Sequence, residues 1–135
     1  MQDRSPSVRV GQTHIERQTT GNTNELLVAS WFCRHGFDVF LPVGTPSVDF
    51  VAVSSTRTDK VQVKTATWQP REKCYAVKLE PQKYTRVKPD VFVFVTSKNV
   101  TGTVIYAIPT AFIDGKKTLR LGGKYKEFTD FISVI

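Results

Sequence analysis

Residues 48–65 read VDFVAVSSTRTDKVQVKT. The first six positions are apolar on both faces of a strand except for Asp49, which is typical of a strand covered on both sides. The last five positions alternate strictly, so they predict a second strand that carries Gln62 and Lys64 on one face. The polar residues 54–60 predict a turn, and the two strands therefore form a hairpin.

The hairpin brings Asp49 close to Gln62, thirteen residues later in the chain. A carboxylate in an apolar strand costs on the order of several kcal/mol to desolvate unless it is paired, protonated or bound to a metal ion. Lys64 leaves the same face two residues beyond Gln62, roughly 6–7 Å along the strand. Asp49 and Gln62 could therefore point at one spot, and Lys64 would flank it.

This spot has the composition of a metal site. The side chains of Asp49 and Gln62, the backbone carbonyl of Val63 and the carboxylate of Glu25, if its helix packs on the sheet, form an oxygen-rich set that suits a hard cation such as Mg²⁺, with Mn²⁺ able to substitute. Lys64 beside it could orient an attacking water or lower the pKa of that water. Together these groups are suited to the hydrolysis of a phosphodiester bond.

Simpler interpretations exist for each residue. Glu25 follows Asn22 by three positions and could be only the partner in a helix-capping box. Gln62 and Lys64 could belong to the solvated face of a half-buried strand. Asp49 could be a structural carboxylate, although its apolar surroundings make that harder to accept.

The flanking segments extend the hairpin into a larger domain. Residues 1–20 are polar with little periodicity and predict an N-terminal arm. A helix then begins near Asn22 and ends at His35-Gly36, and the remaining β-rich runs indicate an α/β domain with a mixed sheet. The predicted further elements are strands at 37–41, 75–79, 91–95, 104–108 and 119–121, a helical turn at 109–113 and a short helix at 128–132.

The chain has 135 residues, the size of a single domain. Its net charge of +7 comes from residues 61–135, which hold thirteen Lys and Arg against six Asp and Glu. A positive surface attracts DNA or RNA, but also other anions. The residues predicted to contact a nucleic-acid backbone are Lys78, Lys83, Arg86, Lys88, Lys116, Lys117, Arg120, Lys124 and Lys126.

Several classes of protein are disfavoured. No apolar run approaches the roughly 20 residues of a membrane span, and the N-terminus does not resemble a signal peptide, so we expect a cytoplasmic protein that does not bind membranes. Cys33 and Cys74 predict buried reduced thiols, and the two histidines do not have zinc-ligand spacing. With so few histidines, a Ser-His-Asp or Cys-His nucleophile is weakly supported.

Glu25 on a first helix, Asp49 on a strand and Gln62-Val63-Lys64 on the next strand resemble the core of the PD-(D/E)XK nucleases, which include archaeal Holliday-junction resolvases and many restriction enzymes. The sequence is most similar to a subgroup of group I intron homing endonucleases in which glutamine replaces the second acidic residue of the motif. The similarity covers about residues 20–125 and includes the blocks 90–95, 104–109 and 119–121. Two departures are Val48 in place of a common proline and the neutral Gln62.

The resemblance implies a restriction-endonuclease-like αβββαβ fold over residues 21–135. It implies that Asp49, Gln62, Val63 and Glu25 form the metal site, and that Lys64 positions the nucleophile. It also implies a homodimer or homotetramer acting on double-stranded or branched DNA, with Phe92/Phe94 or Phe128/Phe131 as interface or core residues. Site-specific homing cleavage, junction resolution and binding without cleavage all remain open.

Overall fold

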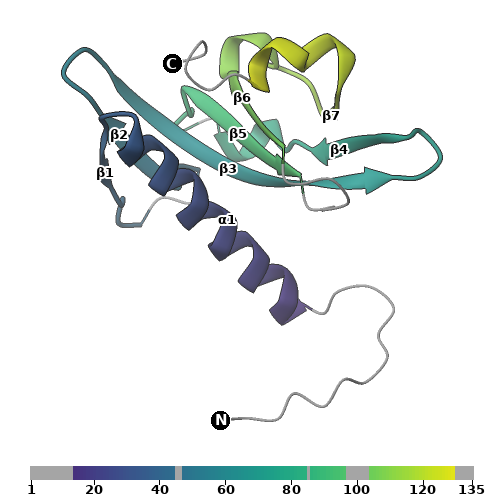
Figure 1. Ribbon diagram of the computed structural model, residues 1–135, viewed down its shortest axis with the longest axis horizontal. Helices are drawn as coiled ribbons and strands as arrows, with labels where there is room; N and C mark the ends of the chain where they lie inside the picture. The colour runs from purple at the N-terminus through teal and green to yellow at the C-terminus, as the bar shows by residue number, and fades with distance from the viewer. Residues whose placement is uncertain (1–13, 45–46, 85, 97–103, 130–135) are drawn as a thin grey trace.

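A computed structural model describes residues 14–44, 47–84, 86–96 and 104–129. Within these residues one helix and a seven-stranded sheet form the domain, together with three short 3₁₀ helices (Figure 1). The elements are α1 His14–Arg34, β1 Asp38–Phe40, β2 Phe50–Val53, β3 Thr58–Gln69, β4 Cys74–Lys78, η1 Pro81–Tyr84, β5 Val91–Thr96, β6 Ile105–Pro109, η2 Thr110–Phe112, β7 Thr118–Leu121 and η3 Gly123–Thr129.

Strand β3 is the centre of the sheet. Along its first half it pairs antiparallel with β2, and from its middle onward it pairs parallel with β5. Its last residues pair antiparallel with β4, which in turn pairs with β7, while β1 and β6 extend the sheet beside β2 and β5. The sheet is therefore mixed, as predicted for an α/β domain. In place of a second helix, β4 and η1 connect β3 to β5.

The part of the sheet around β5 is covered on both faces. Helix α1 packs on one face through Val28 and Phe32, which are fully buried against β2, β3 and β5. The other face carries a second apolar cluster, in which Phe94 and Ile108 join Phe128 of η3. All six residues of β5 are buried, as expected for a strand covered on both sides.

Helix α1 includes residues that the sequence placed in the arm. It already contains His14, so Asn22 lies inside the helix and does not cap it. The predicted helix start was therefore wrong, while residues 1–13 lie outside the described part. Helix α1 ends at Arg34, and Gly36 adopts a φ of 86°, which confirms the predicted glycine stop.

One further prediction needs correction, and one open alternative is decided. The turn after β2 is shorter than predicted, because β3 begins at Thr58 and its register with β2 already pairs that residue with Val53. Phe92, Phe94 and Phe128 are 4%, 0% and 9% exposed, so they are core residues and not interface residues. Phe131 lies outside the described residues.

The two cysteines and the length and apolarity of α1 bear on two further predictions. Cys33 is an exposed free thiol, so its predicted burial was wrong, and Cys74 is half-buried and also free. The one α-helix described, α1, does not have the length and apolarity needed to cross a membrane.

Candidate active site

Asp49 is held against β3 by two hydrogen bonds. Its backbone N–H donates to the carbonyl of Val61 at 2.8 Å. In return, the N–H of Val63 donates to Asp49 Oδ2 at 2.6 Å. Because Phe50 pairs with Val61, Asp49 stands level with Gln62, as the hairpin argument predicted. The carboxylate therefore has a fixed place at the middle of β3.

Glu25 reaches this carboxylate from α1. Burial raises the pKa of Glu25, and the neighbouring negative charge of Asp49 and a hydrogen bond between the two side chains raise it further. Burial also raises the pKa of Asp49, although the Val63 N–H, Glu25 and Lys64 oppose the shift. Two carboxyl groups in contact hold a shared proton or attract a cation. Glu25 is thus not a capping residue, because Asn22 lies within the same helix.

We expect the metal-free protein to lose stability at neutral pH because of this pair. A carboxyl group whose pKa is raised by folding contributes stability below its ordinary pKa, and that contribution is lost as the pH rises through the folded pKa. In EDTA, the unfolding midpoint of Asp49→Asn should therefore rise relative to that of the native protein as the pH increases. The rise should begin above the ordinary carboxyl pKa values of 3.8 and 4.5. A constant difference between pH 4 and pH 8 would contradict this expectation. Excess Mg²⁺ should reduce the difference.

Gln62 supplies a buried oxygen to the same region. The residue is 8% exposed, and its Oε1 has no hydrogen-bond partner among the described residues. An unpaired buried polar oxygen costs roughly 1–3 kcal/mol, so a ligand that satisfies it is favoured. This oxygen and the carboxyl groups of Glu25 and Asp49 are hard donors that suit Mg²⁺. No group of three or more His, Cys, Asp or Glu side chains in the described ranges could hold a metal, so such a site needs Gln62 or the backbone of Val63.

The substitution Gln62→Leu should separate stability from metal binding. We expect the free energy of unfolding of the metal-free protein to rise by about 1 kcal/mol, because the unpaired oxygen is removed. The stabilisation by added Mg²⁺ should shrink at the same time. The matched variant Gln62→Glu should do the reverse at neutral pH, since a third carboxylate destabilises the empty site and strengthens cation binding. Urea unfolding with and without Mg²⁺ measures both effects, and a destabilised Gln62→Leu variant would exclude a penalty at Oε1.

Lys64 lies close enough to Asp49 for their charges to interact, and its side chain is half-buried. Burial lowers its pKa, and the positive charge of Lys83 lowers it further, whereas Glu80 and Asp49 raise it. Its Nζ lies 5.9 Å from the centroid of the Tyr84 ring, within cation–π distance. A lysine with a lowered pKa and a fixed position can both donate to an anion and exchange a proton with water.

Two further residues, which the sequence did not indicate, lie at this place. Tyr84 is 9% exposed, and burial raises the pKa of its hydroxyl, with a smaller contribution from the charge of Asp49. Glu80 forms an ion pair of 2.8 Å with Lys83 and acts on the charge of Lys64. Both belong to the turn around η1, which has no motif, so no signal in the sequence pointed to them.

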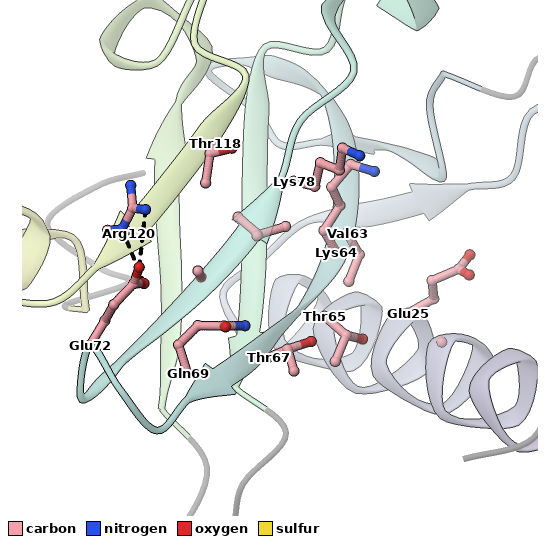
Figure 2. Close-up of a pocket in the computed structure, with 13 residues that line it drawn as sticks. Glu25, Val63, Lys64, Thr65, Thr67, Gln69, Glu72, Lys78, Thr118 and Arg120 are labelled. Carbon is pink, nitrogen blue, oxygen red and sulfur yellow. Dashed lines mark hydrogen bonds and ion pairs between the residues drawn. The ribbon is translucent and has the colours of Figure 1, made fainter. Parts of the chain in front are cut away.

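An open cleft of about 710 Å³ leads away from Lys64 and Glu25 (Figure 2). One wall is α1, represented by Gly21 and Glu25, and the floor is the β3–β4–β7 part of the sheet. In the view of Figure 2, Lys64 and Lys78 lie toward one end of the cleft, and Arg120 and Glu72 lie toward the other. The remaining lining residues are Val63, Thr65, Thr67, Gln69, Ala76, Val77 and Thr118.

The predicted basic residues occupy several places. Lys78 and Arg120 line the cleft, whereas Lys88 and Lys116 border a second cavity of about 320 Å³. Lys124 and Lys126 lie on η3. Lys83, Lys88 and Arg120 each pair with a carboxylate, namely Glu80, Asp114 and Glu72. Arg86 and Lys117 are exposed.

Comparisons with known proteins agree on one family and fold. The sequence model of a family described as PD-(D/E)XK endonuclease matches residues 15–111. Protein 5.3 of Escherichia phage T7 is 45% identical over 53 residues, a match that covers 38% of this chain and 45% of the phage protein. The alignment thus spans less than half of that relative.

Two solved structures are similar in fold. A bacterial homing endonuclease, I-Ssp6803I, superposes with a TM-score of 0.61 and 18% identity, over 78% of each chain. The Holliday junction resolvase Hjc of Archaeoglobus fulgidus superposes with a TM-score of 0.58 and 13% identity, over 85% of this chain and 94% of that one. Their similarity confirms the predicted restriction-endonuclease-like fold.

Proposed function

This chain belongs to the PD-(D/E)XK endonuclease family, and on that premise we propose that it is a Mg²⁺-dependent enzyme that hydrolyses phosphodiester bonds of double-stranded DNA at specific sites. The observation that carries the proposal is the meeting of Glu25, Asp49, Gln62 and Lys64 at the middle of β3. Two carboxyl groups, a buried unpaired oxygen and a half-buried lysine are more than a strand face needs for stability.

The metal ion would be held by Asp49, Glu25 and Gln62 Oε1, with the backbone carbonyl of Val63 as a further ligand. A bound Mg²⁺ supplies Lewis acidity and lowers the pKa of a coordinated water. The protein contributes the placement of its ligands, since the Val63 N–H fixes the Asp49 carboxylate. It also contributes the Lys64 ammonium, which would meet the negative charge that develops on the phosphate.

The cleft is the proposed path of the DNA. It begins at the predicted metal ligand Glu25 and at Lys64, and it continues over a polar floor to Arg120. Cutting both strands of a duplex needs two active sites, so we propose that the enzyme works as a homodimer or homotetramer. The exposed lysine Lys78 would contact the DNA backbone near the reacting phosphate.

Junction resolution is the second candidate, because the fold also matches that of an archaeal Holliday junction resolvase. Cleavage of a labelled linear duplex library, a supercoiled plasmid and a synthetic four-way junction, with Mg²⁺ or with EDTA, tests both candidates. We expect metal-dependent cutting at discrete duplex positions. Preferential cutting of the junction regardless of its sequence would favour resolution, and binding without cutting on every substrate would indicate an inactive DNA-binding domain.

A further inference from the structure

The floor of the cleft is one polar face of the β3–β4–β7 sheet. Thr67 pairs with Ala76 across β3 and β4, and Ala76 pairs with Arg120 across β4 and β7. Residues directly opposite each other on paired strands put their side chains on the same face, so these three form one row. Lys78 and Thr118 form a second row.

The two faces of this part of the sheet differ sharply. Ala66, Val77, Leu119 and Leu121 point the other way and are buried in an apolar cluster. Nothing in the described chain covers the polar face, where Thr67 and Arg120 are exposed. An antiparallel sheet often has one solvated face, but here that face forms the floor of a concave cleft that also contains Lys64.

The side chains on this face can distinguish bases. Arginine donates two hydrogen bonds to guanine, glutamine pairs with adenine in the major groove, and a threonine methyl contacts the methyl of thymine. The cleft contains one arginine, Arg120, and one glutamine, Gln69, and Thr67 lies two residues before Gln69 on β3. A β-ribbon is also one of the two elements that the major groove admits.

Arg120 is oriented by a neighbour. Its Nε and Nη2 each donate to a carboxylate oxygen of Glu72 at 3.2 Å (Figure 2). This pairing leaves Nη1 and one hydrogen of Nη2 to donate to a ligand. It also offsets the positive charge of Arg120, so the side chain should attract DNA phosphates less strongly than an unpaired arginine. Its remaining N–H groups are held in one direction.

Distances along β3 relate this face to the reacting centre. Thr67 lies three residues and Gln69 five residues beyond Lys64 on the same strand. These odd separations put both side chains on the opposite face of β3 from Lys64, although all three border the same cleft. At about 3.3 Å per residue, these positions lie roughly 10 and 17 Å from Lys64 along the strand. Along a duplex that rises about 3.4 Å per base pair, this corresponds to roughly three and five base pairs.

We propose that the polar face of β3, β4 and β7 reads base edges in the major groove, with Arg120 selecting guanine and Gln69 selecting adenine about three to five base pairs from the cut. The inference rests on the proposed endonuclease function and deepens it, because it names the residues that would supply the proposed site specificity. Lys78 and Thr118 contact the backbone beside these bases. Glu72 holds Arg120 in the orientation needed for readout.

The test is selection of bound duplexes from a randomised DNA library in EDTA, followed by sequencing. We expect the native protein to enrich guanine at one position by roughly 5- to 150-fold over other bases, the range of a bidentate arginine contact. Arg120→Lys keeps the charge but loses the planar fork. It should bind DNA and lose that preference, and Gln69→Ala should lose only the adenine preference.

The matched control is Arg34→Ala, which removes an exposed positive charge at the far end of α1. It should leave the selected sequence unchanged. An Arg120→Lys variant that still selects guanine, or a native protein that selects no sequence, overturns the inference. Because selection is read without metal, failure of the proposed catalysis appears separately, as selected duplexes that Mg²⁺ does not cause to be cut.

Discussion

Replacing Asp49 by asparagine is expected to slow Mg²⁺-dependent DNA cleavage by at least about 1000-fold. The metal ion contributes several kcal/mol to the transition state, and each 1.4 kcal/mol or so corresponds to a factor of ten in rate. Asparagine retains an oxygen to accept the Val63 N–H, so the strand geometry should persist. Single-turnover cleavage of the preferred substrate at saturating protein measures the effect.

The control for this substitution is Asp38→Asn, on the exposed edge strand β1. It removes the same charge far along the sheet from Lys64 and should cut at the native rate. We expect Asp49→Asn to bind DNA as tightly as the native protein or more tightly, because a negative charge beside the phosphate path is removed. An Asp49→Asn enzyme with near-native cleavage would rule out the proposed metal site.

Replacing Lys64 by methionine is expected to reduce the single-turnover rate by on the order of 100- to 1000-fold, the usual effect of removing one donor that stabilises a developing oxyanion. Methionine preserves most of the length and packing of the half-buried chain. The loss should therefore appear in the rate at saturating DNA, with a smaller change in affinity. Circular dichroism and the unfolding midpoint should remain close to native, because burial of the lysine ammonium is itself unfavourable.

Arg34→Met removes one positive charge away from the cleft and is the matched control for Lys64→Met. Its cleavage rate should equal the native rate. A Lys64→Met variant that is impaired only in DNA affinity, with an unchanged rate at saturation, would mean that Lys64 serves as a phosphate contact and not in the chemical step.

Strands were well predicted where the sequence is patterned, and the pairing of one hairpin was predicted as well. The hairpin, β5 and β6 follow from their apolar patterns, because burial on one or both faces leaves a period in the sequence. The start of α1 does not, because the Thr- and Gly-containing stretch before Asn22 has a weak helix propensity. The middle of the helix is tied to the sheet by a contact distant in sequence, since Asn24 Nδ2 donates to Thr65 Oγ1 at 2.7 Å.

In the candidate site, too, residues with a local sequence signal could be predicted, and residues placed by the fold could not. Asp49 could be identified because a charge in an apolar run is locally anomalous, and Gln62 and Lys64 followed from the strand period. Tyr84 could not be identified, because only the path of the chain between β4 and β5 brings its ring near Lys64. The role of Arg120 depends on the register between β4 and β7, which joins strands far apart in sequence.

Strand β3 is a single uninterrupted element of twelve residues that carries both Lys64 and Gln69. Successive side chains of a strand alternate between faces, so inserting one residue between these positions would turn the residues beyond it to the opposite face. The spacing between cutting and recognition can therefore change only by pairs of residues, in steps of roughly 6–7 Å, or about two base pairs. Relatives built on this strand should differ in cut position by such steps, and intermediate offsets would require a β-bulge.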